Sequence, residues 1–287
     1  MGRRGRNDPI MKVIYELFGA TALKTPNAGV RPLDVVGLCP GEKISRRGRL
    51  RSALVNGDAV EEQLKKAIDP PVRAANVSGV RSSSVDAGLG LDILGGLLEG
   101  FSLPAAGINS QFNKARKVSF KFDDVMKEQI DSFALGAVLQ GTKINAGNPA
   151  MADFSGEDPC QFLVINLVFT SRSFSVRAET EAGAGLKIDT GAIGKLVGEA
   201  SATVKFNALT ESEISFEGPE ALTFAFATER LFIDNGGTVW KTSQRVDIPV
   251  VAMARASGLP VTLAPERVRL TPEPSLLALE DHPEARF

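Results

Sequence analysis

The clearest pattern of hydrophobic and polar positions lies between Gln161 and Asp234. Four apolar runs there are rich in Val, Ile, Phe and Thr and are joined by Gly- and Ala-rich connections, which is typical of β-strands. The runs are Phe162–Thr170, Ala202–Phe206, Ile214–Phe216 and Leu222–Phe226. Between the first two, the chain turns polar and small, and the segment Leu186–Val197 fits neither a core helix nor a plain loop. We therefore predict a long antiparallel ribbon whose middle changes conformation.

The N-terminal part shows a helix pattern followed by short strands. Asp8-Pro9 is typical of a helix start, because Asp caps the first turn and Pro fits the first helical position. Apolar residues follow at helical spacing up to Gly19, which predicts a short amphipathic helix at residues 9–18. Further elements are predicted as strands at Thr21–Lys24 and Val35–Leu38 and as a helix at residues 58–68.

A glycine-rich apolar segment covers residues 88–101 and carries five glycines. Each Gly inside a helix costs about 1 kcal/mol relative to Ala. The segment is therefore either an ordinary glycine-rich core helix, or helical in one state and extended in another. Shortly before it, Asn76–Val80 has the composition of a strand start.

Hydrophobic and polar residues alternate over Arg116–Phe122, with Val118, Phe120 and Phe122 on one face. This predicts a half-buried strand, or equally a strand that faces lipid on one side and water on the other. The acidic start of Asp123–Lys127 predicts that a helix opens directly after this strand.

The C-terminal part begins with a hairpin signal and then becomes rich in proline. Asp234–Thr238 predicts a tight turn that joins Arg230–Ile233 to Val239–Lys241, and Val246–Met253 adds a strand or a short helix. From Gly258 onward, prolines recur through a segment that we expect to be exposed and open to proteases. The apolar patch Leu276–Leu279 follows, and such a patch must dock against the rest of the chain or be an aggregation liability.

Composition excludes several classes of function. The chain has 287 residues, enough for one large or two small domains, and its net charge of −1 gives no reason to expect a nucleic-acid partner. It contains no apolar run of about 20 residues and no secretory signal pattern. The single histidine, His282, leaves no Ser-His-Asp triad or His-based zinc site in the body, and we expect no cofactor. Cys39 and Cys160 are expected to be unpaired thiols in a reducing compartment, since a disulfide would need a geometry that the sequence does not give.

Basic residues are concentrated between Arg3 and Arg51 in a chain that is otherwise close to neutral. They are either ordinary solvated charges or a face that meets phosphate headgroups, where each Lys or Arg contributes about 1 kcal/mol. The lipid-binding candidates are Arg3, Arg4, Arg6, Lys12, Arg46, Arg47, Arg49 and Arg51.

Taken together, the order and spacing of these segments resemble the pore-forming domain of the gasdermin family, most of all the bacterial gasdermins. The resemblance covers most of the chain, although none of its segments is an invariant motif. It is carried by Asp8–Leu17, Ala22–Lys24, Arg31–Gly37, Asn76–Gly79 with the glycine-rich segment, Phe120–Val125, Phe162–Thr170 with Val204–Phe206, and Glu213–Phe226.

The resemblance implies an α+β fold, a twisted antiparallel sheet with surrounding short helices. It divides the chain into a pore-forming domain at residues 1–257 and a linker with an autoinhibitory peptide at residues 258–287. It implies that the intact protein is cytoplasmic and autoinhibited, and that a protease removes the C-terminal peptide. The body then binds membrane lipids, inserts into the inner membrane and assembles a homo-oligomeric β-barrel pore. Cell death of the pyroptotic type, as in antiviral defence against phage, is the implied consequence.

Residue roles follow from the same resemblance. Leu276, Leu277 and Leu279 would supply the autoinhibitory contact. For cleavage, Arg267 and Arg269 suit a trypsin-like protease and Leu270 another kind, and a caspase-like protease is also a candidate partner. The membrane-inserting candidates are Leu89, Leu91, Ile93, Val118, Phe120, Phe122, Val164, Val168, Val204 and Phe206.

One departure from the family pattern concerns the N-terminus. Bacterial members commonly carry a lipidated cysteine there, whereas this chain has Arg3 and Arg4, and its first cysteine is Cys39. We expect the basic N-terminus to substitute in part for a lipid anchor, and the departure leaves room for a fungal member of the family. The alternative function is a non-lytic β-rich binding or structural protein. An enzyme is not expected, because Gly88-Leu89-Gly90 lacks the rest of a phosphate-binding motif.

Overall fold

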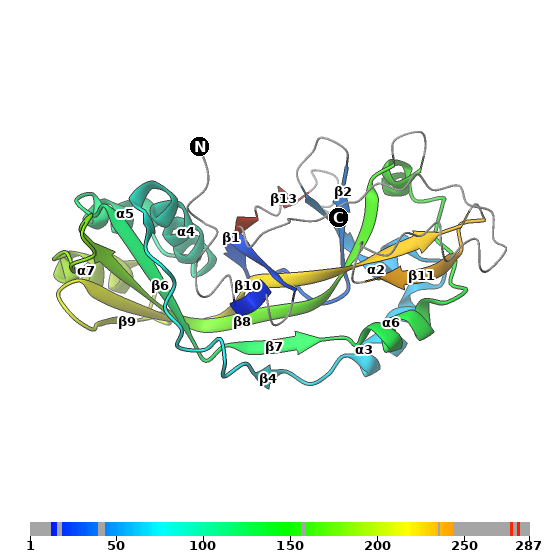
Figure 1. The fold of residues 1–287 in the computed structure, drawn as a ribbon, viewed down its shortest axis with the longest axis horizontal. Helices are drawn as coiled ribbons and strands as arrows, with labels where there is room; N and C mark the ends of the chain where they lie inside the picture. The colour runs from blue at the N-terminus through cyan, green and yellow to red at the C-terminus, as the bar shows by residue number, and fades with distance from the viewer. Residues whose placement is uncertain are drawn as a thin grey trace.

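Two long antiparallel strands, β8 (Gln161–Glu179) and β10 (Glu213–Ile233), organise the molecule. The computed structural model describes residues 13–15, 19–39, 44–155, 159–234, 236–243, 276–277 and 280–281. The pairing of β8 with β10 runs from Arg177↔Glu213 to Leu163↔Arg230 and is interrupted by three irregularities of register. Figure 1 shows both strands reaching from one end of the molecule to the other. The predicted antiparallel sheet with surrounding short helices is confirmed.

The remaining strands add to this pair on both sides. The main path of the sheet is β12-β1-β10-β8-β2-β3-β13, while β6 and β7 also pair with β8, and β9 and β11 with β10. The strands have these bounds: β1 Thr21–Asn27, β2 Asp34–Leu38, β3 Ser45–Arg49, β4 Val72–Arg73, β5 Val85–Asp86, β6 Lys117–Asp123, β7 Met126–Gln129, β9 Lys205–Ala208, β11 Val239–Ser243, β12 Leu276–Leu277 and β13 Glu280–Asp281.

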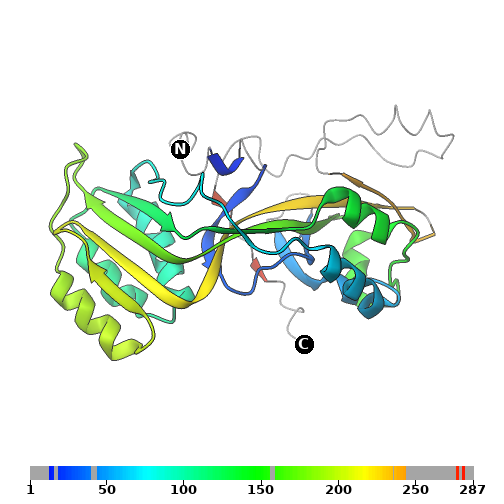
Figure 2. The same ribbon diagram turned by 90° about the horizontal axis from the view of Figure 1, so that it is seen from below.

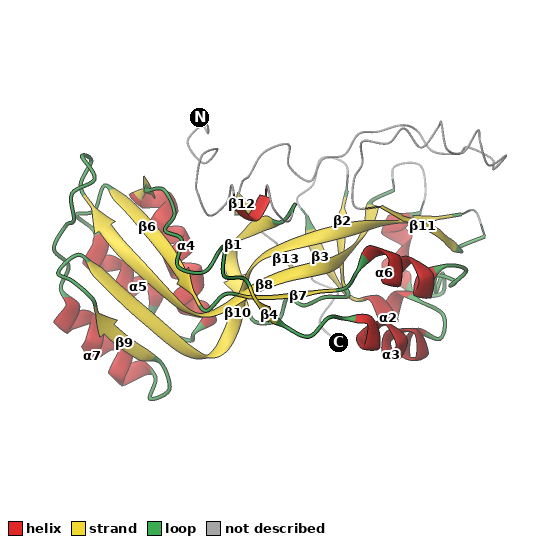
Figure 3. Cartoon of the chain, turned by 60° about the horizontal axis from the view of Figure 1, so that its bottom comes forward, coloured by secondary structure: helices red, strands yellow, loops and turns green. Residues whose placement is uncertain are grey.

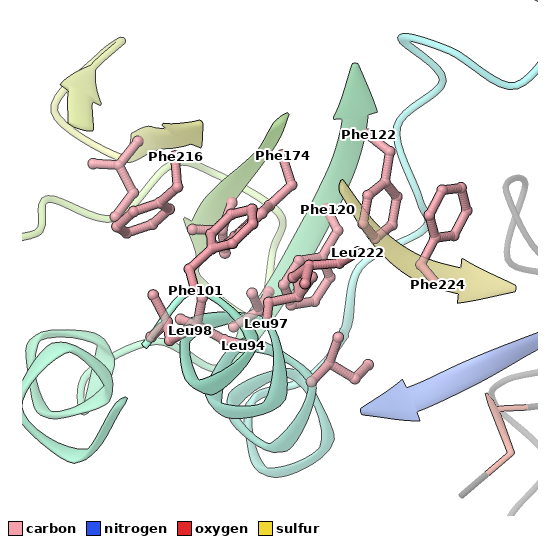
Figure 4. Packing of buried hydrophobic residues seen from close by; sticks show 14 of the residues in the cluster. Leu94, Leu97, Leu98, Phe101, Phe120, Phe122, Phe174, Phe216, Leu222 and Phe224 are labelled. Atoms are coloured by element: carbon pink, nitrogen blue, oxygen red, sulfur yellow. The ribbon is translucent and has the colours of Figure 1, made fainter. Parts of the chain in front are cut away.

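One end of the sheet carries the lobe that we call the α4–α7 lobe, made of β6, β9, the facing ends of β8 and β10, and three helices. The helices are α4 (Ala87–Gly100), α5 (Ala105–Asn109) and α7 (Thr190–Ala200), and the short helix η2 (Ser110–Phe112) follows α5. Figure 2 shows these helices gathered on one face of the strands. Figure 4 shows Leu94 and Leu97 of α4, and Phe101 directly after it, pointing at the phenylalanines of the strands. This face forms the largest apolar cluster, in which the rings of Phe122 and Phe224 stack at 4.2 Å between centroids.

The other end carries the α2–α6 lobe, formed by three helices, η3 and β11. The helices are α2 (Leu50–Ala53), α3 (Gly57–Ala67) and α6 (Ser132–Leu139), and η3 covers Pro149–Phe154. Their buried residues, among them Leu64 and Leu135, meet Phe162 and Val164 of β8 in a second apolar cluster. The sheet therefore has a separate core at each end, and β8 contributes to both.

Most predicted elements are present. A helical turn at residues 13–15 ends where the Gly19 amide donates to the Tyr15 carbonyl at 2.9 Å, with Gly19 at φ +62°. The early strands correspond to β1 and β2, the helix at residues 58–68 to α3, and the hairpin after Ile233 to the turn between β10 and β11. The rest of residues 9–18 and the segment Val246–Met253 lie outside the described residues.

The predicted polar connection after Thr170 is instead the second half of β8, which continues to Glu179. Phe174, Val176 and Ala178 are buried there, while polar residues alternate with them. The polar residues on the other side of this half are largely buried as well, among them Ser175 and Glu179. Farther on, the semi-polar segment contains the start of α7, whose first turn is capped by Asp189 accepting a hydrogen bond from the Ala192 amide at 2.9 Å.

Two local predictions are wrong. Asn76–Val80 is a turn and not a strand, because Gly79 has φ +79° and the Ser78 amide donates back to the Ala74 carbonyl. Asp123–Lys127 does not open a helix: Asp124 has φ +49° and turns the chain from β6 into β7. The next helix, α6, is capped instead by Asp131, which accepts hydrogen bonds from its first amides.

The expectation of unpaired thiols is also wrong, because Cys39 and Cys160 form a disulfide bond. The bond joins the residue after β2 to the residue before β8. It follows the last strand pair, Leu38↔Gln161, and so closes the open end of this pairing. The cysteines are 121 residues apart in sequence, which is why only the folded sheet brings them together.

A buried carboxyl group in the α2–α6 lobe predicts a pH dependence of stability. Glu229 of β10 is buried, and its Oε2 has no hydrogen-bond partner. Burial raises the pKa of Glu229 above that of an ordinary glutamate, the charge of Asp131 adds to this, and hydrogen bonds with Thr242 and Ser132 oppose it only in part. A carboxyl group with a raised folded pKa destabilises the fold where it is ionised, so the penalty grows as pH rises through that pKa and is absent below the unfolded value.

We expect Glu229→Gln to raise the free energy of unfolding by about 1 kcal/mol at about pH 8 and to give no gain at about pH 4. Urea unfolding at both pH values measures this difference. An equal effect at the two pH values would show that the ionised carboxylate is not the cause.

Candidate functional site

The most informative feature for function is the contact of two short C-terminal strands with the two ends of the main sheet path. β12 pairs in parallel with β1, with Leu276 beside Ala22 and Leu277 beside Leu23. β13 pairs in parallel with β3, with Glu280 beside Ser45 and Asp281 beside Arg46. We call β12 and β13 together the C-terminal clasp. Figure 3 shows β12 at β1 and β13 close to β3.

The clasp brings the two ends of the path close together. Only residues 278 and 279 separate β12 from β13. An extended chain advances about 3.3–3.6 Å per residue, so Leu277 and Glu280 lie within about 11 Å of each other. One short segment therefore spans from β1 to β3, and both strands would be edges without it.

Covering these edges has a physical reason. An edge strand presents a row of unpaired N–H and C=O groups that can pair with another chain. On β1 the neighbouring residues are Ala22 and Leu23, both 3% exposed, which belong to two different apolar clusters. The clasp thus occupies backbone groups beside apolar surface, the combination that otherwise invites association.

The β3 side of the site is dominated by ion pairs. Asp34 of β2 is fully buried and accepts from Arg46 at 3.0 Å and from Arg49 at 2.9 Å. Glu61 of α3 binds Arg49 at 3.1 Å and Arg51 at 3.4 Å. Burial acts to raise the pKa of Glu61, but the hydrogen bonds and charges of Arg49 and Lys65 outweigh it and hold that pKa below its ordinary value.

The fourth arginine of this group, Arg47, pairs with Asp153 at 2.6 Å and is 6% exposed. All four of these lipid-binding candidates thus have acidic partners within the body in this conformation. Lipid binding by them stays a prediction. Arg3, Arg4, Arg6 and Lys12 lie outside the described residues, as do the cleavage candidates Arg267, Arg269 and Leu270 and the contact candidate Leu279.

Most membrane-inserting candidates lie together in the α4–α7 lobe. Those from β6, from β9 and the residue before it, and from α4 apart from Leu89 belong to the largest apolar cluster or pack against it, while Leu89 is 37% exposed. The cluster members and neighbours are Leu91, Ile93, Val118, Phe120, Phe122, Val204 and Phe206. Val164 and Val168 are also buried, but in two other clusters. The structure therefore brings together seven of the ten candidates, leaves Leu89 exposed on α4, and separates Val164 and Val168 from the rest.

The strands of this lobe have one apolar and one polar face. On the apolar face, sequence reasoning missed Phe174, Val176 and Ala178 of β8, although their spacing of two residues was a usable signal. The opposite face holds a polar network, in which Arg81 binds Glu213, and Glu179 accepts from Ser84 and Ser119. Strands of this kind match the pattern of a membrane barrel, where residues alternate between lipid and water.

The helices of the lobe keep the apolar face covered in this conformation. α4 is apolar on nearly all sides and carries the five glycines noted above, three of them within buried stretches of the helix. Position 90 has no room for a side chain, because a Cβ on Gly90 would lie 2.6 Å from the Cβ of Val118. The glycine thus allows α4 to lie close against β6.

Neither a membrane-spanning helix nor a metal site is found in the part of the chain that the structure describes. No described helix is long and apolar enough to cross a bilayer. Within the same residues, no group of three or more His, Cys, Asp or Glu could hold a metal ion. The C-terminal clasp therefore pairs with the edges β1 and β3, while the amphipathic strands of the α4–α7 lobe are covered by helices.

Comparison with known proteins gives consistent results. The family model described as the Bacterial Gasdermin Family matches residues 23–238. The chain is 30% identical to a gasdermin of a Desulfuromonadales bacterium, covering 80% of this chain and 83% of the relative, and 27% identical to one of Vitiosangium, covering 96% and 98%. A solved gasdermin from Bradyrhizobium tropiciagri has a similar fold, with a TM-score of 0.56 and 15% identity over 81% of this chain and 90% of that one.

Proposed function

This chain belongs to the bacterial gasdermin family, whose members form pores in membranes and are not enzymes, and from this we propose that it is a pore-forming protein held inactive by its own C-terminal segment. A protease cuts the linker, the C-terminal segment leaves, and the body assembles on the membrane as a closed β-barrel. The consequence is permeabilisation of the inner membrane and death of the cell, as a defence against phage.

The observation that carries this proposal is the C-terminal clasp. It occupies both β1 and β3, the strands that become sheet edges when β12 and β13 are removed. Free edges pair readily with another chain, so loss of the clasp favours association of several copies. In a bilayer such a sheet must close, because no water satisfies unpaired backbone groups there.

The α4–α7 lobe supports the second half of the proposal, the change of shape. Its strands already alternate between apolar and polar residues, and α4 and α7 cover the apolar side. The glycines lower the intrinsic stability of helix α4, since each Gly in a helix interior costs about 1 kcal/mol relative to Ala. We propose that α4 and α7 unwind and lengthen the neighbouring strands, so that the side now facing the helices faces lipid.

Cleavage and lipid binding are assigned to separate parts of the chain. We place the pore-forming domain at residues 1–257 and the linker with the inhibitory peptide at residues 258–287, with cleavage at Arg267, Arg269 or Leu270. Anionic headgroups would be met by the basic N-terminus and by the arginines of β3. Since these arginines now bind Asp34, Glu61 and Asp153, lipid phosphate has to compete with carboxylates for them.

Dye release from anionic liposomes tests the proposal. We expect the chain truncated after Arg269 to release most of the dye. The full chain should release no more dye than the addition of buffer alone. Liposomes without anionic lipid serve as the control for the basic residues. If full and truncated chains leak equally, the C-terminal segment is not the inhibitor. If no truncation between Gly258 and Pro274 gives leakage, the pore-forming function itself is refuted, and a non-lytic binding protein becomes the better description.

A further inference from the structure

We propose that the disulfide bond between Cys39 and Cys160 is a redox-controlled lock, which holds β2 and β3 against β8 and is opened by a dithiol reductant. The lock is a property of the folded chain. Only its effect on membrane leakage rests on the proposed function.

The position of the bond gives it this role. β2 is joined to β8 by four residue pairs, from Val35↔Val164 to Leu38↔Gln161. The cysteines come next on both strands, so the bond closes the end at which this pairing would begin to open. β2 in turn holds β3, on which β13 docks. The same two strands are therefore fixed by a covalent bond on one side and by the clasp on the other.

The surroundings of Cys39 favour exchange with a thiol. Arg47 Nη2 donates a hydrogen bond to Cys39 Sγ at 3.4 Å, and Asp153 holds Arg47 in place. Cys39 is half-buried, while Cys160 is 9% exposed, so Cys39 is the more accessible sulfur. A guanidinium group beside a sulfur attracts an incoming thiolate and stabilises the thiolate form of the cysteine.

Reduction of the bond by thiol–disulfide exchange takes two steps and transfers two electrons in total. One thiolate of the dithiol attacks Cys39 Sγ, the bond to Cys160 breaks, and Cys160 leaves as a thiolate. The second thiol of the reductant then loses its proton to solvent. Its sulfur attacks the first sulfur of the reductant, which is bonded to Cys39 Sγ in the mixed disulfide, and Cys39 leaves as a thiolate beside Arg47. The dithiol is oxidised to a disulfide, and the protein gains two thiols.

Hydrogen–deuterium exchange of the intact full chain tests the lock without any membrane. We expect reduction by dithiothreitol to speed exchange at least tenfold for amides of β2 and of residues 161–164 in β8. The amides that pair β6 with β8 at the other end, such as Val118 and Val176, should speed up less than those of β2, because they respond only to the loss of overall stability. Cys39→Ser with Cys160→Ser should exchange at the fast rate with or without reductant. Unchanged exchange at β2, equally faster exchange everywhere, or two free thiols in the air-oxidised chain by maleimide labelling would overturn the lock.

Leakage then shows whether the lock controls activation. We expect the chain truncated after Arg269 to release dye several-fold faster when reduced, and the double serine variant to be fast in both conditions. Equal rates for the oxidised and reduced truncated chain, together with faster exchange at β2, would refute control of leakage by the bond. If no form leaks at all, the pore-forming function fails, and the exchange result still decides the lock.

Discussion

The full chain carrying Leu276→Pro and Leu277→Pro is expected to release dye from anionic liposomes without any cut, to about the extent of the chain truncated after Arg269. Proline has no backbone N–H and is tolerated poorly in a paired strand. Both substitutions fall in β12, whose strand partner among the described residues is β1. Of the two strand pairings described for the clasp, only that of β13 with β3 would then remain, and the edge of β1 would be free.

A matched variant separates loss of pairing from loss of the leucines. Leu276→Val with Leu277→Val keeps apolar side chains and backbone donors and favours strands, so this variant should stay as inactive as the unchanged chain until it is cut. Dye release and sedimentation of the protein with liposomes are measured for both variants. If the proline variant stays inactive while the truncated chain leaks, the pairing of β12 with β1 does not hold the protein inactive.

Loss of the Cys39–Cys160 bond is expected to lower the free energy of unfolding by about 3–5 kcal/mol. The bond closes a loop of 121 residues, and the loss of chain entropy that a cross-link imposes on the unfolded state grows with loop length. Domains are stable by only about 5–15 kcal/mol in total, so this is the largest effect on stability that we expect from any pair of side chains described here.

Urea unfolding followed by circular dichroism measures this effect. The variant Cys39→Ser with Cys160→Ser and the reduced unchanged chain should show the same loss, and reductant should not alter the variant further. A difference below about 1 kcal/mol between oxidised and reduced chain would mean that the unfolded state gains little freedom when the bond is broken.

Local patterns were sufficient to predict much of the fold. The mainly apolar run Phe162–Thr170 predicted the first half of β8, and strict alternation predicted β6. The second half of β8 was missed because one side of it is polar, and single-strand alternation is weak when Ser and Arg fill the polar positions. The turn at Asp124 was missed because a residue at positive φ that is not glycine leaves little trace in the sequence.

The site was less predictable, since it depends on contacts between distant parts of the chain. The apolar patch Leu276–Leu279 had to dock somewhere, but its register on β1 depends on a pairing across about 250 residues, which periodicity does not encode. The arginines at residues 46–51 were visible as a cluster, while their partners Asp34, Glu61 and Asp153 are scattered. The disulfide needed the pairing of β2 with β8 to bring its cysteines together.

The short reach of the C-terminal clasp has a consequence for the dose at which the protein acts. While the linker is intact, β12 and β13 are held near their edges at an effective concentration that is typically millimolar for a tethered segment. A cut between Arg269 and Leu270 breaks none of the strand pairs. It turns the segment into a separate peptide, which is present only at the concentration of the protein itself. Release then depends on dilution below the dissociation constant of the peptide. A cell that holds much of the protein would restrain it by rebinding even after complete cleavage, and added peptide would act as an inhibitor.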